Sequence, residues 1–316
     1  MTKTVAIIGA TGLQGGGVLN SLYDTGKYKI RALTRNPSGE PAKLLLMKYP
    51  GIEVAAADLD DTESLRKAFK DIDIVFGVTQ FFQKEIMDKI EAGDIDAEYI
   101  QGKNMVDAAI AAGVKDMVFS SLDSMKKVSG GKYPNVLHFE GKYRIQEYLI
   151  SKADQIRGFV VHVGSYMENF VNYARISSED NMTVEFYFPY SAEIMLPLVD
   201  GAKDTGAVVA YILDHPEEYL GKVVEISGGY YEAQDMVKAF TEVIGKPARY
   251  VQTAYEDVPS EELKEMFYAL QEFGLFSGKE KLHAQNEKID YKFVTPTEFW
   301  KNRGWAGPVS SSQRTI

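Results

Sequence analysis

The stretch Gly9-Ala10-Thr11-Gly12-Leu13-Gln14-Gly15 directly follows the apolar run at residues 5–8 and opens an amphipathic segment at residues 13–25. This order predicts a strand, a glycine-rich turn and a helix. Glycines there let the backbone turn tightly and approach a pyrophosphate, while the helix N-terminus attracts its charge. Strand-to-helix turns without a ligand use glycine too. The position of this motif at the first strand and first helix nevertheless favours a dinucleotide site.

The first half of the chain repeats the order of strand and helix. Apolar runs predict six buried strands, at residues 5–8, 29–33, 53–57, 74–78, 117–120 and 159–163. Helical patterns lie between or after them, at residues 13–25, 42–48, 62–70, 96–112 and 138–151. Such alternation is typical of βαβ units, so we expect an α/β fold with a Rossmann-like, doubly wound parallel sheet of six strands.

The alternation breaks after about residue 174. This predicts an NAD(P)-binding Rossmann domain at residues 1–174 and a smaller α/β region at 175–316, with some of its elements packing back on the first domain. In the second region, strands are expected at residues 184–187, 194–197 and 223–226, and helices at 207–213, 233–244, 261–273 and 296–302. The polar residues 308–316 are expected to be loose.

The composition excludes several classes of function. Among 316 residues the formal net charge is −10, which argues against direct binding to nucleic acid. There is no cysteine, so thiol chemistry is excluded, and the four histidines match no metal-ligand spacing, so we expect no metal site. No apolar run approaches the roughly 18 residues of a membrane span. A cytoplasmic protein without signal peptide or membrane contact is expected, also nuclear if the source is eukaryotic.

The end of the second predicted strand bears on the choice of cofactor. An acid at this place would bind the ribose hydroxyls of NAD, but this chain has Arg35 followed by Asn36. A guanidinium suits the extra 2′-phosphate of NADP, through charge-assisted hydrogen bonds. A solvated surface arginine is the alternative. Asp58, after the third predicted strand, either contacts the adenine or caps the next helix.

Several motifs together resemble the NmrA-like family, whose members are atypical short-chain dehydrogenases/reductases. They are Gly9–Gly15, Thr34-Arg35-Asn36-Pro37, His138-Phe139-Glu140-Gly141-Lys142, Tyr166-Met167-Glu168-Asn169 and Leu196-Pro197-Leu198-Val199-Asp200. The resemblance runs from about residue 3 to about residue 300. It is strongest to the branch of HSCARG-type NADPH sensors.

The resemblance implies a set of NADP(H) contacts. Gly9, Ala10, Thr11, Gly12, Leu13, Gln14 and Gly15 would surround the pyrophosphate, Arg35 and Asn36 the 2′-phosphate, and Asp58 and Leu59 the adenine. Thr79, Gln80 and Phe81 would follow the fourth strand, Lys142 would reach the nicotinamide ribose, and Tyr166, Met167, Glu168 and Asn169 would line the nicotinamide pocket. The family has a lysine at a further cofactor contact, and this chain has Ile100 at that position.

The pair His138 and Lys142 stands where active short-chain reductases have a tyrosine acid and a lysine four residues later. Three interpretations remain open. Lys142 anchors the cofactor ribose and His138 is a neighbour; Lys142 alone is the acid, as implied by similar isoflavone-reductase relatives; or His138 donates the proton, since imidazole titrates near neutrality.

These observations lead to two functional hypotheses. The first is an NADP(H)-binding sensor or regulator with little or no turnover, monomeric or homodimeric, whose segments 81–94 and 124–136 become ordered on cofactor binding and are read by a protein partner. The second is an NADPH-dependent oxidoreductase that reduces a small carbonyl, imine or quinone, with Lys142 or His138 as the catalytic residue.

Overall fold

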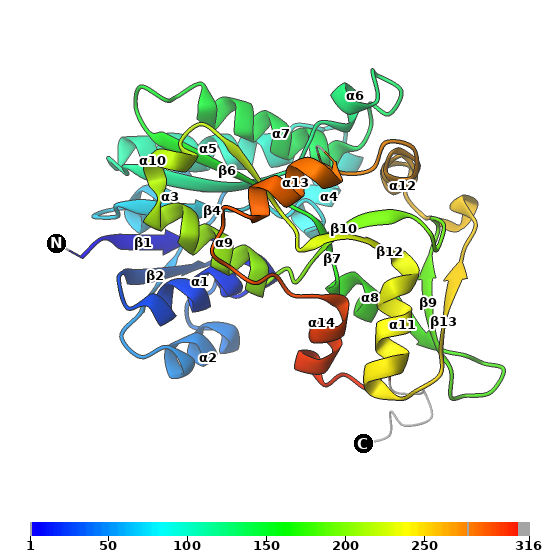
Figure 1. Ribbon diagram of the computed structural model, residues 1–316. Coiled ribbons are helices and arrows are strands. Elements are labelled where there is room, and N and C mark those ends of the chain that lie inside the picture. The colour runs from blue at the N-terminus through cyan, green and yellow to red at the C-terminus, as the bar shows by residue number, and fades with distance from the viewer. Residues whose placement is uncertain (1, 277, 309–316) are drawn as a thin grey trace. The chain divides into compact units, whose positions relative to one another are not determined.

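The computed structural model describes residues 2–276 and 278–308, which form two compact units (Figure 1). The described residues of the first unit are 2–124, 137–163 and 202–226, and those of the second are 125–136, 164–201, 227–276 and 278–308. The expected loose tail, residues 308–316, lies outside the described residues except for Pro308. No helix in the described part of the chain is long and apolar enough to cross a membrane.

A parallel sheet of seven strands organises the first unit, in the order β11-β6-β5-β4-β1-β2-β3. Its strands are β1 (Thr4–Ile7), β2 (Lys29–Thr34), β3 (Glu53–Ala56), β4 (Ile74–Gly77), β5 (Asp116–Ser121), β6 (Arg157–Val163) and β11 (Val223–Ile226). The predicted α/β class and the doubly wound parallel sheet are confirmed, with each expected strand within two residues of its place.

The predicted number of six strands was wrong, because β11 is a seventh. Its residue Val223 pairs in parallel register with Val160 of β6. Sequence pattern identified Val223–Ile226 as a strand but placed it in the second region. A strand's own residues do not encode its partner, and this partner lies about sixty residues earlier in the chain.

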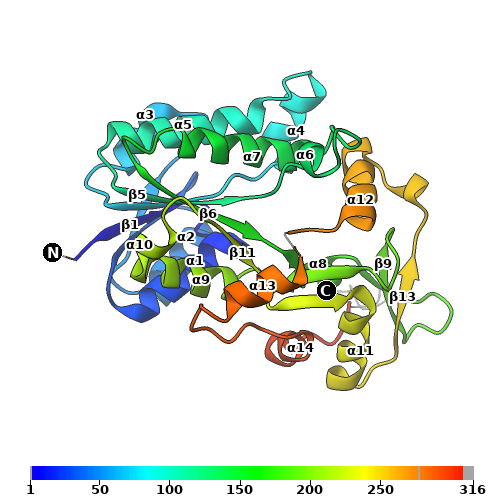
Figure 2. The same cartoon turned by 45° about the horizontal axis from the view of Figure 1, so that its top comes forward.

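Helices cover both faces of the sheet (Figure 2). Helices α3 (Thr62–Ala68), α5 (Ala97–Ala111) and α7 (Leu137–Ile150) lie next to one another on one face, and α1 (Leu13–Thr25) and α9 (Lys203–Asp214) pack together on the other. The unit also contains α2 (Glu40–Lys48), α4 (Lys84–Glu91) and α10 (Pro216–Tyr219). The apolar core includes Leu65, Val75, Met105 and Phe119, which are completely or almost completely buried.

Both segments that were expected to become ordered on cofactor binding contain a helix, α4 in residues 81–94 and α6 (Met125–Val128) in residues 124–136. Within residues 81–94 the chain forms α4, with Ile86 fully buried against Phe81 and Ala97. An ion pair between Lys84 and Asp88, 2.6 Å apart, spans one turn of its exposed side. The lysines and acids of this segment, typical of a solvated loop, are therefore the outer face of an amphipathic helix.

The second unit contains two sheets of three strands, in the orders β12-β10-β7 and β13-β9-β8. The strands are β7 (Ser165–Tyr166), β8 (Ala174–Ile176), β9 (Val184–Phe188), β10 (Met195–Val199), β12 (Gly229–Glu232) and β13 (Ala248–Gln252). The helices are α6 (Met125–Val128), α8 (Glu168–Asn172), α11 (Ala233–Ile244), α12 (Glu261–Phe273), α13 (Lys279–Asn286) and α14 (Pro296–Arg303), with a 3₁₀ turn at Tyr255–Asp257.

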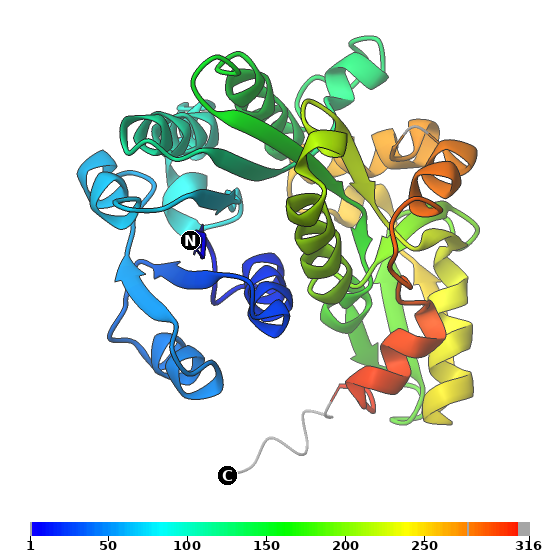
Figure 3. The same cartoon turned by 60° about the vertical axis from the view of Figure 1, so that its left-hand side comes forward.

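Aromatic side chains form much of the core of the second unit. Helices α11 and α14 lie side by side (Figure 3), and Phe240 of one packs edge-on against Trp300 of the other. Phe186 of β9 contacts both rings, and the indole N–H of Trp300 donates to the carbonyl of Met236 at 2.8 Å. The domain boundary expected near residue 174 stays a prediction.

Candidate dinucleotide-binding site

The glycine-rich turn after β1 has a backbone that side chains would obstruct. Gly9 adopts a left-handed conformation with φ of +67°, and its carbonyl accepts a hydrogen bond from Gly12 N–H at 2.8 Å. A Cβ atom on Gly15 would overlap the carbonyl of Gly9. Two of the predicted glycines are therefore needed for the path of the chain itself, whatever the turn binds.

The N-terminus of α1 has no side-chain cap within the described residues. The N-cap residue is Gly12, and among the described residues no side chain caps this helix, nor is there an acid in its first turn. Thr11, Gly12 and Leu13 are exposed. An exposed, uncapped helix N-terminus with a close glycine turn fits a pyrophosphate group.

Helix α3 shows the opposite arrangement. Its N-cap residue is Asp61, whose carboxylate accepts hydrogen bonds from the N–H groups of Glu63 and Ser64, at 3.0 and 3.1 Å. Asp58 does not cap this helix, so that interpretation of Asp58 was wrong. The carboxylate of Asp58 accepts instead from the N–H of Asp60 at 2.9 Å, within the turn. Its role at the adenine stays a prediction, as does that of Leu59.

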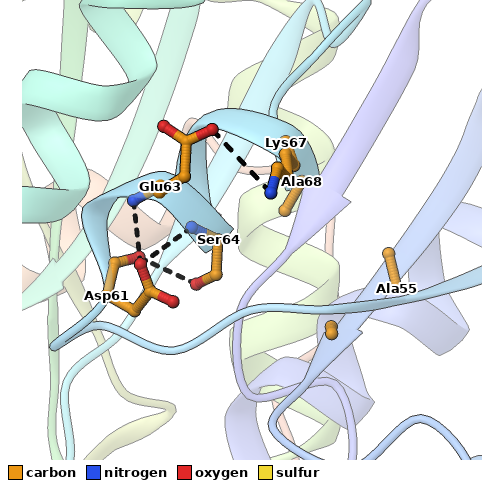
Figure 4. A pocket seen from close by; sticks show the side chains of 7 residues that line it. Ala55, Asp61, Glu63, Ser64, Lys67 and Ala68 are labelled. Atoms are coloured by element: carbon orange, nitrogen blue, oxygen red, sulfur yellow. Dashed lines mark hydrogen bonds and ion pairs between the residues drawn. The ribbon is translucent and has the colours of Figure 1, made fainter.

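A cavity of about 320 Å³ lies between β3 and α3 (Figure 4). Its lining residues are Ala55, Ala56, Asp61, Glu63, Ser64, Lys67 and Ala68. None of them belongs to the predicted cofactor set. Asp61 is occupied as a helix cap, and Glu63 and Lys67 pair with each other at 3.8 Å. We therefore place the candidate site at the glycine turn and not in this cavity.

Arg35 and Asn36 follow β2 directly. The Arg35 side chain is 53% exposed, and its Nη1 atom lies 3.5 Å from a carboxylate oxygen of Glu85 on α4. Asn36 accepts from the hydroxyl of Ser38 at 3.0 Å and so stabilises the turn. The guanidinium is thus accessible at the end of a strand next to β1, which is compatible with both the phosphate-binding and the surface interpretation.

The residues after β4 point in different directions. Thr79 is buried, and its hydroxyl donates to Oε1 of Glu98 at 2.8 Å. Gln80 accepts from the side-chain amide of Gln83 at 3.2 Å. Phe81 is buried among Ile86 and Ala97. Phe81 is therefore a core residue, and its contact with the cofactor stays a prediction.

Lys142 on α7 forms an ion pair with Glu98 on α5. The two side chains are only 13% and 2% exposed, respectively. Oε1 of Glu98 accepts from both Lys142 and Thr79, so one carboxylate oxygen connects two predicted cofactor residues. Its other oxygen, Oε2, is buried and has no hydrogen-bond partner within the described chain.

His138 lies one turn before Lys142 on α7 and is surrounded by aromatic rings. Its imidazole is 5.1 Å from the ring of Phe82, 5.8 Å from that of Phe81 and 4.7 Å from that of Phe139, measured between centroids. The residue is almost fully buried. These contacts fix the imidazole by packing.

Hydrogen bonds hold α7 on the sheet. The hydroxyl of Ser121, at the end of β5, donates to the carbonyl of Lys142 at 3.0 Å. Gln146 and His162 of β6 are hydrogen-bonded at 2.7 Å, and the second ring nitrogen of His162 lies 3.3 Å from Asp123. Lys142 is thereby fixed at the carboxyl ends of β4 and β5.

The motif Tyr166-Met167-Glu168-Asn169 belongs to the second unit. Tyr166 pairs with Val199 in the sheet, and the N–H of Met167 donates to the carbonyl of Val199 at 2.9 Å. Burial raises the pKa of Glu168 to about 7, although its carboxylate accepts from the N–H of Gly201 at 3.2 Å. The part of these residues in a nicotinamide pocket stays a prediction.

Glu98 was not predicted as a site residue from the sequence. Its place in an amphipathic helical pattern resembled that of any solvated acid, and it comes 44 residues before its partner. The available signal was Gly141. A Cβ there would lie 2.7 Å from Oε2 of Glu98, so the glycine marks a close approach of α5 to α7.

The strand order and the glycine turn define a protein of the Rossmann class, and comparison with known proteins gives its family. The model of the NmrA-like family matches residues 1–302, so the chain belongs to the NmrA-like family. A relative from Cladobotryum sp., described as the NmrA-like family domain-containing oxidoreductase FrzB, is 30% identical over 270 residues, which cover 79% of this chain and 76% of that protein.

Solved structures of the same fold include proteins of two kinds. NmrA, a negative transcriptional regulator crystallised with NADP, has a TM-score of 0.76 at 20% identity, with 95% of both chains covered. The Escherichia coli NADPH-dependent quinone oxidoreductase QOR2, crystallised with NADPH, has a TM-score of 0.70 at 23% identity, with 95% of this chain and 99% of that chain covered. At these identities the likeness shows the fold alone.

Proposed function

We propose that this chain binds NADP(H) and acts as a sensor or regulator that responds to the NADPH/NADP⁺ ratio, with little or no turnover. The observation that carries the binding is the uncapped N-terminus of α1 behind a turn that only glycine can form at Gly9 and Gly15. A pyrophosphate would satisfy the N–H groups that the helix leaves to a ligand.

The strand order supports one orientation of the cofactor. β1 lies between β2 and β4, so the topology switches direction there, and ligands of such sheets bind across the carboxyl ends at that point. The adenosine half would extend toward β2 and β3, where Arg35 and Asp58 follow the strands. The nicotinamide half would extend toward β4 and β5, where Thr79 and Lys142 lie. When bound, the nicotinamide supplies hydride chemistry.

The surroundings of His138 and Lys142 favour sensing over turnover. The first is packed among three aromatic rings, and the second is paired with a buried carboxylate. A tyrosine acid is missing from the position where reductases have it. A bound cofactor would then shift the equilibrium between two conformations of the protein, to the extent that it binds one more tightly than the other. A protein partner could detect this shift by binding only one of the two conformations.

The second candidate function is an NADPH-dependent reductase of a small carbonyl, imine or quinone. It is favoured by the names of the relatives, among them the oxidoreductase from Cladobotryum and the quinone oxidoreductase of E. coli. In this function Lys142, or His138 after a rearrangement of its aromatic neighbours, would donate a proton to the reduced substrate.

Calorimetric titration with NADPH and NADH tests the binding. Wild type should bind NADPH more tightly, and Arg35→Ala should lose roughly 30-fold in affinity for NADPH with little change for NADH, because only NADPH has a 2′-phosphate. Equal losses for both would contradict the assignment of Arg35.

Purified protein with NADPH and a panel of quinones, carbonyls and imines should leave the reduced-nicotinamide absorbance unchanged. Steady turnover that Lys142→Ala abolishes would establish the reductase instead.

A further inference from the structure

We propose that Glu98 is a positioning residue for Lys142 whose negative charge sets the preference of the site between NADP⁺ and NADPH. The inference rests on the proposed cofactor site, with Lys142 on its nicotinamide side. It concerns a side chain that no sequence motif identified and that the cofactor itself need not touch.

Glu98 forms hydrogen bonds to residues from two different segments of the site. Its Oε1 atom accepts from the hydroxyl of Thr79, after β4, and from the ammonium of Lys142, on α7. The carboxylate is 2% exposed, so water does not screen this charge well. Loss of Glu98 would therefore free both donors and leave the ammonium of Lys142 without its counter-ion.

The packing of α5 against α7 leaves room for the carboxylate of Glu98. Oε2 of Glu98 lies where a side chain on Gly141 would begin, only 2.7 Å from the position of its Cβ. One turn further along α5, Gly102 makes room in the same way for Ile145 of α7. Two glycines, one on each helix, thus bring the helices close enough for Glu98 to reach Lys142.

The charge balance of the pair gives the redox preference. The nicotinamide ring of NADP⁺ carries a positive charge that NADPH lacks. An ammonium alone would repel the oxidised ring, whereas the pair of Lys142 and Glu98 is neutral as a whole. We expect a unit charge left uncompensated near the nicotinamide ring to change binding by roughly tenfold.

The test is a charge cycle measured as the ratio of the dissociation constants of NADP⁺ and NADPH, by calorimetry at constant pH and salt. Glu98→Gln should raise this ratio roughly tenfold, because the ammonium then repels the oxidised ring. Lys142→Met should lower the ratio, because the carboxylate attracts that ring. The double variant has neither charge and should return to within about twofold of the wild-type ratio.

Asp107→Asn is the matched control. Asp107 is another carboxylate of α5 that contacts α7, through the hydroxyl of Tyr148 at 2.5 Å, but it lies more than two turns from Glu98. This variant should leave the ratio unchanged. The double variant also guards against misfolding: if either single variant is too unstable to titrate, the double variant should still unfold at a higher temperature than Lys142→Met, because no unpaired buried charge remains.

The outcomes separate the inference from the proposed function. If wild type binds neither NADP⁺ nor NADPH, the proposed function is wrong. If wild type binds both but Glu98→Gln weakens them by the same factor, Glu98 has only a structural role and the inference is overturned. The inference would also be overturned if Glu98→Gln and Lys142→Met changed the ratio of the dissociation constants in the same direction.

Discussion

Helices α1 and α3 each follow a strand of the same parallel sheet, yet their N-termini are satisfied in different ways. At α3 the chain supplies its own acceptor, since the carboxylate of Asp61 binds two N–H groups of the first turn. At α1 the corresponding residue is Gly12, which has no side chain to offer. The difference separates a helix whose first turn is capped by its own chain from one without a side-chain cap, where we propose that the pyrophosphate binds.

The largest expected effect comes from giving α1 the cap that α3 has. Gly12→Asp would place a carboxylate over the first turn of α1, and with it a negative charge where the pyrophosphate would bind. We expect NADPH affinity to fall at least roughly a hundredfold. The unfolding free energy should change by less than about 1 kcal/mol, because the gain from the cap is opposed by the close approach of the new Cβ to the carbonyl of Gly9. Calorimetric titration and urea unfolding measure the two quantities.

Gly12→Asn is the matched control for that change. Its amide oxygen caps the helix as a carboxylate does but carries no charge, so we expect a smaller loss of NADPH affinity, roughly tenfold. Unchanged NADPH affinity in Gly12→Asp would mean that the first turn of α1 is not the phosphate site.

The acid in the first turn of a third helix, α8, is buried. Burial raises the pKa of Glu168 to about 7 from its ordinary value of 4.5. The folded protein therefore prefers the protonated carboxyl: the associated stability is full below about pH 4.5 and is lost as the pH rises through 7. At pH 8, Glu168→Gln should be more stable than wild type by up to about 3 kcal/mol.

The pH dependence of that difference provides the check. Thermal and urea unfolding of wild type and Glu168→Gln should converge near pH 4.5, where both side chains are uncharged, and diverge above it. A constant difference at all pH values would show that the amide changes the packing, and that the carboxyl of Glu168 does not titrate near neutrality.

Removing the cap of α3 should have a moderate effect on stability and none on binding. Asp61→Ala deletes the acceptor for the N–H groups of Glu63 and Ser64, which costs about 1 kcal/mol of unfolding free energy. NADPH affinity should stay within about twofold of wild type. Asp61→Asn, which keeps the acceptor, should lose less stability. A large loss of NADPH affinity in Asp61→Ala would place cofactor at α3.

The smallest expected effect concerns Glu85, whose carboxylate lies 3.5 Å from the guanidinium of Arg35. Glu85→Gln should raise NADPH affinity about twofold at low salt, because an exposed acid competes weakly with the 2′-phosphate. The gain should vanish at high salt. Glu63→Gln, another exposed acid, should show no gain; if it shows the same gain, the effect comes from net charge and not from Arg35.

The elements that the sequence predicted well are those with local signals. Leu13–Thr25 begins at its glycine turn and ends before Gly26, which is left-handed, and the structure has the same bounds. The seventh strand could not be placed, because the pairing of β11 with β6 depends on tertiary structure. Helix α4 was missed because one buried side chain, Ile86, decides its position among many charged ones.

The candidate site was predicted where a motif encodes backbone geometry and missed where distant side chains meet. The turn at Gly9–Gly15 has the expected strand and helix on either side. Glu98 became visible only when the structure brought α5 against α7, because an acid in a helical pattern gives no sign of its partner. Likewise, the aromatic surroundings of His138 combine residues from two separate segments, at Phe81, Phe82 and Phe139.

The comparison of α1 with α3 can be tested directly by amide NMR spectroscopy during titration with NADPH. The backbone N–H resonances of Leu13 and Gly15, in the first turn of α1, should shift with saturation at one equivalent. Those of Glu63 and Ser64, already bonded to Asp61, should stay in place. Saturable binding that leaves the α1 resonances unmoved, or no binding at all, would show that the first turn of α1 is not the cofactor site.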